Sequence, residues 1–122
     1  MLSIRPEQMA VFSASLRKRF ETDMAAHLET FFPKPCAAMG PEELAVFIRR
    51  TVDKALAYGI ERERDVCKFL DVAMALGKDF DHDPQHPWAR EILTDASLVG
   101  QEKISRLVKA ALEIEAQERP HQ

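Results

Sequence analysis

The stretch PEELAVFIRRTVDKALAYG, residues 41–59, decides the fold class of this sequence. Its apolar residues recur every three or four positions, which places them on one face of an α-helix; they are Leu44, Phe47, Ile48, Val52, Ala55 and Leu56. Gly40, Pro41 and two following glutamates form a helix-start signal. Gly59 is a natural stop, because glycine adopts positive φ at no steric cost. We therefore predict a helix from Pro41 to Tyr58.

The longest helix is predicted upstream, from about Pro6 to Phe31. Its stripe has the same spacing and consists of Met9, Phe12, Leu16, Phe20, Met24, Leu28 and Phe31. Pro33 and Pro35 push the residues before them out of the α region, so this helix is expected to end at Phe32. A stripe rich in Phe and Met over this length is expected to exceed what a small bundle covers, and the exposed remainder would form a partner groove or the seam of a homodimer.

Three helices are predicted in the second half of the chain. One runs from about Arg62 to Leu76 and ends at Gly77, again through glycine. A short helix opened by Pro87 covers about 88–93. The last starts near Asp95 or Ser97, either of which can cap it, and extends to about Gln117. Gly100, early in this helix, is expected to mark a close helix contact.

The fold class that follows is all-α, with one domain over residues 1–122 and an ordered core of about 4–117. Four main helices and one short helix are expected to form a small bundle of antiparallel neighbours with short connections. A chain of 122 residues is long enough to hold a core without a metal or disulfides.

Composition narrows the function classes. The net charge is −3, which disfavours a nucleic-acid binder that relies on bulk positive charge. The longest stretch without charged residues runs only from Gln8 to Leu16, whereas a membrane span needs about 20 apolar residues. No secretory signal is visible, and the two cysteines, Cys36 and Cys67, predict reduced thiols in a cytoplasmic protein rather than a disulfide framework or a zinc motif. No catalytic set and no cofactor site is assembled by the sequence.

The loop from Lys78 to Trp88 is the one segment that could carry metal chemistry. Its candidate ligands are Asp79, Asp81, Asp83, His82 and His86. As an EF-hand it fails, because Pro84 stands where glycine must turn and Arg90 where a bidentate glutamate belongs. As a zinc site it needs His82 and His86 on one face, which the prolines oppose.

The same loop has two other interpretations, which are compatible with each other. In the first it is architectural, with Asx turns from the aspartates and with Phe80 and Trp88 burying their rings to pin it to the bundle. In the second it is a rigid recognition surface that offers a partner preorganised contacts. The candidate partner-binding residues are Tyr58, Phe80, Asp81, Pro84, Pro87 and Trp88.

Three stretches carry a resemblance to a family: ALAYGIERERDV at 55–66, LGKDFD at 76–81 and PW at 87–88. Together they resemble a pattern in small uncharacterised helical proteins encoded near type VI secretion spike and effector genes of bacteria. The resemblance implies a small cytoplasmic accessory protein, such as an adaptor or co-chaperone of a secreted effector, and it brings no catalytic residues.

The leading functional hypothesis is therefore a non-enzymatic protein–protein interaction module. A metal-binding enzyme or sensor built on the Asp79–His86 loop is the first alternative. The second is an immunity protein that neutralises a toxin, because residues 61–122 hold thirteen acidic against nine basic side chains and could face a basic surface.

Overall fold

The computed structural model describes residues 14–118, and within that range it is all-helical. The elements are α2 (Ala14–Phe31), α3 (Pro33–Ala57), α4 (Glu63–Leu76), the short 3₁₀ helix η1 (Phe80–His82), α5 (Pro87–Leu93) and α6 (Gly100–Glu118). The predicted fold class, four main helices plus one short one, is confirmed. The predicted helical residues 6–13 lie outside the described range.

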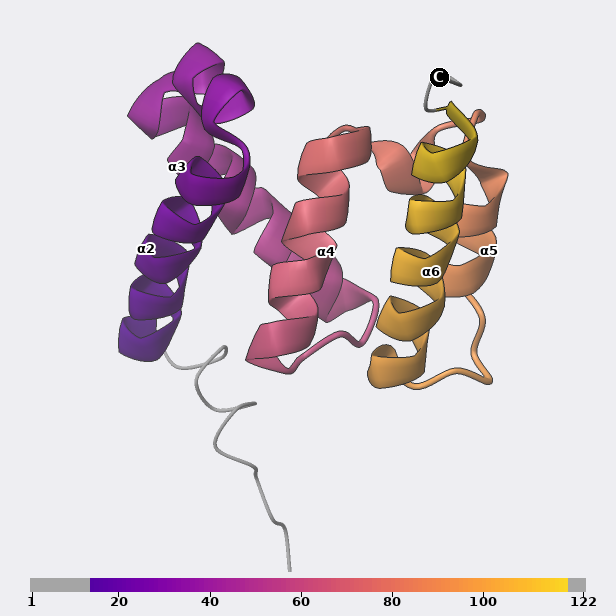
Figure 1. Cartoon of the computed structure of the whole chain (residues 1–122). Coiled ribbons are helices and arrows are strands. Elements are labelled where there is room, and N and C mark those ends of the chain that lie inside the picture. The colour runs from indigo at the N-terminus through magenta and orange to yellow at the C-terminus, as the bar shows by residue number, and fades with distance from the viewer. Residues whose placement is uncertain (1–13, 119–122) are drawn as a thin grey trace, which may run out of the picture.

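The helices stand side by side with α4 in the middle (Figure 1). Helix α3 packs between α2 and α4, and α6 packs between α4 and α5. Helices that follow one another in α2, α3 and α4 run in opposite directions, while α4 and α6 run in the same direction (Figure 1). No helix within residues 14–118 is long and apolar enough to cross a membrane.

The part of the predicted stripe that the structure describes is largely covered, whereas Met9 and Phe12 lie outside the described residues. Phe20 and Leu28 are buried and Met24 is half-buried against the core. The large side chains of the stripe that remain exposed are Leu16, at 40%, and Phe31, at 66%. Because these two lie at opposite ends of α2, the described part of the helix has no continuous apolar seam for a partner or a second copy.

The segment before Pro41 is helical, which the sequence analysis did not predict. Helix α3 begins at Pro33, and Gly40, with φ 80° and ψ 165°, separates a first helical segment from the predicted helix. Pro33 and Pro35 do not prevent this segment, because the N–H groups of a first helical turn have no partner within the helix and proline loses nothing there. The Cys36 N–H already closes the turn on the carbonyl oxygen of Phe32, at 3.1 Å.

Helix α6 begins at Gly100 rather than at Asp95 or Ser97. The Asp95 carboxylate instead accepts hydrogen bonds from the Ser97 N–H at 2.9 Å and the Ser97 hydroxyl at 2.6 Å, which forms a turn ahead of the helix. Gly100 then packs against the turn after α3 so closely that a Cβ atom would overlap the carbonyl oxygen of Gly59. The expected close contact at Gly100 is confirmed.

Helix α4 supplies the centre of the core. Phe69 and Leu70 are fully buried, and the ring of Phe69 lies 5.3 Å from that of Phe80 and 6.3 Å from that of Tyr58. Gly59 and Gly77, at the ends of α3 and α4, have φ of 84° and 115°. Both predicted glycine stops are therefore confirmed, and they set where the η1 loop leaves the bundle.

Candidate functional site

A buried carboxylate organises the loop between α4 and α5. The side chain of Asp81 is fully buried. It accepts hydrogen bonds from the Tyr58 hydroxyl at 2.7 Å and from Lys54 Nζ at 2.9 Å. Burial raises the pKa of Asp81, but these hydrogen bonds and the charge of Lys54 outweigh burial, so its pKa lies below its ordinary value. Burial, together with the hydrogen bond to Asp81, raises the pKa of Tyr58 to about 12.

The structure does not gather the five predicted metal ligands of this loop into one site. Asp81 is committed to Lys54 and Tyr58, while the Asp83 carboxylate accepts the Gln85 N–H at 2.9 Å in an Asx turn. Asp79 is exposed, and His86 lies against Trp88 with ring centroids 5.7 Å apart. His82 Nε2 is 3.3 Å from the Asp81 carboxylate, so only these two of the five are paired. Within residues 14–118 the geometry favours the architectural interpretation of the loop.

The predicted partner-binding residues differ in how far their side chains are exposed to solvent. Phe80 and Asp81 are each 1% exposed, so they hold the loop in place and cannot touch a partner directly. Tyr58 and Trp88 are half-buried. Pro84 and Pro87 are exposed, and these two remain available as a contact surface.

A groove lies between α3 and the end of α4, and the sequence did not predict it. Its volume is about 610 Å³. Helix α3 contributes a face with helical spacing, from Met39 to Lys54, and α4 contributes Ala73 and Met74. We call this the α3–α4 groove; it is lined by Pro35, Met39, Glu43, Val46, Phe47, Arg50, Thr51, Lys54, Ala73, Met74, Gly77, Lys78 and Asp79.

The charged side chains around the α3–α4 groove are three basic and two acidic. Arg50, Lys54 and Lys78 stand against Glu43 and Asp79. Lys54 is paired with Asp81, whereas Arg50 is exposed and its side chain pairs with no other residue of the described range. The groove therefore combines a methionine- and phenylalanine-lined floor with an edge that carries one more basic than acidic side chain and includes the unpaired Arg50.

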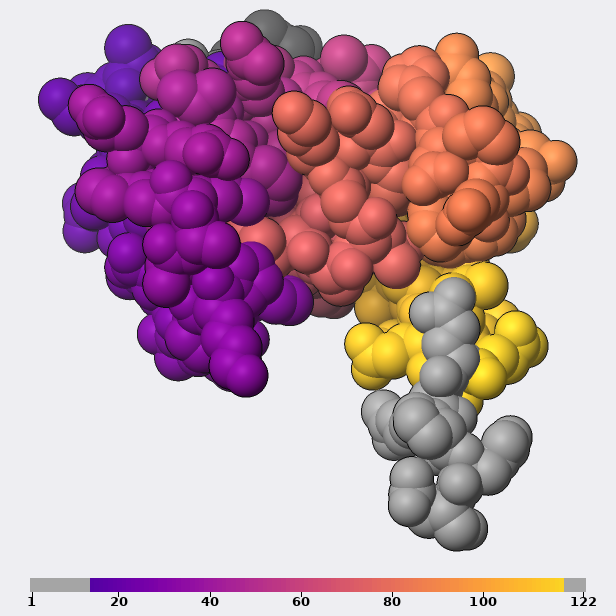
Figure 2. All heavy atoms as spheres, turned by 90° about the horizontal axis from the view of Figure 1, so that it is seen from above, coloured from indigo at the N-terminus to yellow at the C-terminus, as the bar shows by residue number. Residues whose placement is uncertain are grey.

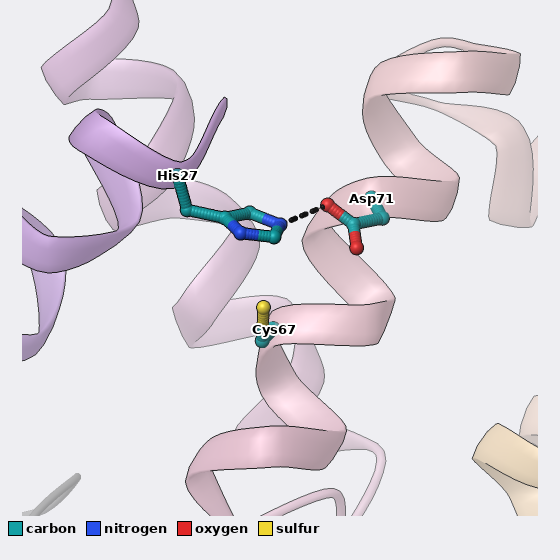
Figure 3. Close-up of side chains that lie close together, drawn as sticks. All are labelled: His27, Cys67 and Asp71. Atoms are coloured by element: carbon teal, nitrogen blue, oxygen red, sulfur yellow. Dashed lines mark hydrogen bonds and ion pairs between the residues drawn. The ribbon is translucent and has the colours of Figure 1, made fainter. Parts of the chain in front are cut away.

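A second cluster joins α2 to α4 (Figure 3). His27 Nε2 lies 2.8 Å from Asp71 Oδ1, and Cys67 is one helical turn before Asp71 on the same face of α4. One ligand atom from each of the three residues lies within 4.8 Å of the others, and this is the one such group of three His, Cys, Asp or Glu side chains in the described part of the chain. All three side chains are half-buried.

The thiol of this cluster is not an activated nucleophile. Burial, and then the charge of Asp71, raise the pKa of Cys67 to about 11, so the thiol is protonated near neutral pH. Burial also raises the pKa of Cys36, which is 5% exposed. Cys67 is a free, half-buried thiol.

Sequence reasoning missed the cluster because His27 joins it through tertiary packing. The i, i+4 spacing of Cys67 and Asp71 was a visible signal for a shared helix face. His27 of α2 and Asp71 of α4 are 44 residues apart in the sequence, so their contact has no local signature.

A smaller cavity of about 380 Å³ lies between α4 and α6, next to this cluster, and Asp71 lines it together with Phe32, Val72 and Leu112. Figure 2 shows the hollow: the last turns of α6 (yellow) stand apart from the corner between α2 and α3 (purple), with α4 between them. Of the three cluster residues, Asp71 is therefore reachable from this cavity.

Comparisons with known proteins gave no match: no family model matches the sequence, and no curated protein or solved structure shows significant similarity to it.

Proposed function

We propose that this chain is a non-enzymatic protein–protein interaction module whose α3–α4 groove binds an acidic, amphipathic helix of a partner protein. The observation that carries the proposal is the groove itself, with its volume of about 610 Å³ and its basic edge.

The shape of the α3–α4 groove suits a helical ligand. Its α3 side extends from Glu43 to Lys54, which is about 16 Å at the rise of an α-helix. A ligand of about three helical turns would match that length and would present two or three apolar anchors. Met39 and Met74 are half-buried, and flexible methionine side chains adapt to such anchors.

The charge of the edge selects the partner. The unpaired Arg50 and the small excess of basic side chains beside an apolar floor attract a helix whose polar face is acidic, and they disfavour a basic one. The finer role, an adaptor or co-chaperone of a secreted bacterial effector in the cytoplasm, is supported by the sequence resemblance alone.

Two synthetic helical peptides test this proposal. They share one apolar stripe and carry either an acidic or a basic polar face. We expect the acidic peptide to bind more tightly, with an affinity that falls as salt increases. Arg50→Glu should weaken this binding at least about tenfold, whereas Arg106→Glu, an equal charge change on the exposed side of α6, should leave it unchanged.

Four results would contradict the proposal. Equal affinity for both peptides removes the charge argument, and binding that Arg50→Glu does not change places the ligand elsewhere. A preference for the basic peptide supports the immunity alternative, in which the acidic second half of the chain faces a basic toxin. Light scattering should show a monomer; a dimer that Arg50→Glu dissociates would mean that a second copy occupies the groove.

A further inference from the structure

The cluster of His27, Cys67 and Asp71 has the composition and spacing of a three-ligand metal site. It offers an imidazole nitrogen, a sulfur and a carboxylate oxygen within 4.8 Å of one another. Ligand atoms around a tetrahedral zinc ion lie about 3.5 Å apart, given bonds of 2.0–2.3 Å. Small side-chain rotations would therefore bring the three atoms to the required distances. Cys67 and Asp71 already share one face of α4, and the His27 ring reaches toward that face from α2 (Figure 3).

The ligand set points to zinc in particular. Zinc accepts sulfur, imidazole nitrogen and carboxylate oxygen in one tetrahedral site, whereas calcium and magnesium prefer oxygen ligands alone. Three protein ligands leave a fourth position for water or an incoming ligand. The His27 and Asp71 side chains are 26% and 36% exposed, so water can reach the cluster from solvent.

The surroundings hold the histidine in a suitable orientation. The ring of His27 packs on that of Phe31, with centroids 4.9 Å apart and planes at 48°. Its Nε2 atom already points at the Asp71 carboxylate, at 2.8 Å. A ring fixed by stacking and by one polar contact loses little conformational freedom when a metal replaces that contact.

We propose that His27, Cys67 and Asp71 bind one zinc ion that links α2 to α4, with water in the fourth position. On binding, the Cys67 thiol releases its proton to solvent and binds as the thiolate. The imidazole binds as the neutral ring through one nitrogen and keeps its proton on the other, and Asp71 binds as the carboxylate. No electron transfer is involved. This proposal is independent of the α3–α4 groove.

Zinc and cobalt(II) binding to the full chain tests it. Competition with a chromophoric chelator should show one equivalent of zinc, with release of protons into a weakly buffered solution. Cobalt should give the near-ultraviolet absorption of a cobalt–thiolate bond. Cys67→Ser should abolish that absorption, and His27→Gln and Asp71→Asn should each weaken zinc binding at least about tenfold.

Two matched variants serve as controls. Cys36→Ser removes the other thiol and His82→Gln removes a histidine of the η1 loop, and neither should change zinc affinity or the cobalt spectrum. Circular dichroism establishes that each variant is folded before it is titrated. Absence of zinc binding, a cobalt complex without the thiolate absorption, or affinity unchanged in all three cluster variants would each overturn the proposal.

Discussion

Replacement of Asp81 tests the network that fixes the loop between α4 and α5. Asp81→Ala removes the acceptor of both the Tyr58 hydroxyl and Lys54 Nζ. Breaking a buried ion pair from one side costs about 3–5 kcal/mol of unfolding free energy. The Lys54 side chain is still 27% exposed and Tyr58 is half-buried, so water replaces part of what is lost. We expect a loss of about 2–3 kcal/mol.

Asp79 provides the matched control. It is also an aspartate of this loop near Lys54, but its carboxylate lies 3.8 Å from Nζ and its side chain is 74% exposed. Asp79→Ala should therefore change the free energy of unfolding by no more than about 0.5 kcal/mol. Urea denaturation followed by far-ultraviolet circular dichroism measures both variants against the wild type. The slope of the transition should stay constant, because the same surface is exposed on unfolding.

The pH dependence of the Asp81 effect follows from its lowered pKa. A carboxyl group with a lowered pKa in the folded state stabilises the protein above its unfolded pKa of about 4, and this contribution is lost as pH falls through the folded value. The difference between wild type and Asp81→Asn should thus be full at neutral pH and shrink below about pH 4. If Asp81→Ala is as stable as Asp79→Ala at neutral pH, Asp81 does not hold the loop.

Three further changes test other parts of the fold. Gly100→Ala should lower the free energy of unfolding by about 1–3 kcal/mol in urea melts, despite the better helix propensity of alanine, because its Cβ overlaps the Gly59 carbonyl. Tyr58 is the only tyrosine, so phenolate absorbance reports its titration alone. Its pKa is about 12 in the folded protein, above the ordinary value of about 10. Its contribution to stability is therefore complete below about pH 10 and declines as pH rises toward 12. The Trp88 Nε1–H is buried without a partner among residues 14–118, so Trp88→Phe should cost less than about 1 kcal/mol in thermal melts and Trp88→Ala about 2–3 kcal/mol.

The helices themselves were predictable because their signals are local. The stripe at Leu44, Ile48 and Val52 is buried as its spacing indicates, and the glycines at 59 and 77 end their helices at positive φ. The helix boundaries were predicted wrongly where two local rules compete. Pro33 and Pro35 predict a break, but both fit a first helical turn, and the chain used that option because Cys36 becomes buried there.

The candidate site was less predictable, because exposure and tertiary pairing decide it. Phe80 is buried, as the architectural interpretation of the loop predicted. Asp81 was expected at a partner surface, yet it is buried too, because its carboxylate bonds to Lys54 of α3. Nothing in the local sequence shows that Lys54, 27 residues away from Asp81, is the counter-charge. The α3–α4 groove likewise depends on the angle at Gly40, which brings Met39 and Pro35 to its end.

Helix α4 contributes to the core, to the α3–α4 groove and to the His27–Cys67–Asp71 cluster. Its packing shows which of its contacts with other helices can rearrange. Its apolar residues face α3 and α6, while its contact with α2 includes the polar pair of Asp71 and His27. Helix α2 packs chiefly on α3, through Phe20 and Leu28 among others, so the α2–α4 contact can adjust without opening the core. A polar contact of this kind costs little to rearrange, since water competes for half-buried groups. A metal bound there would therefore tighten the position of α2 on α4 while leaving the groove between α3 and α4 in place.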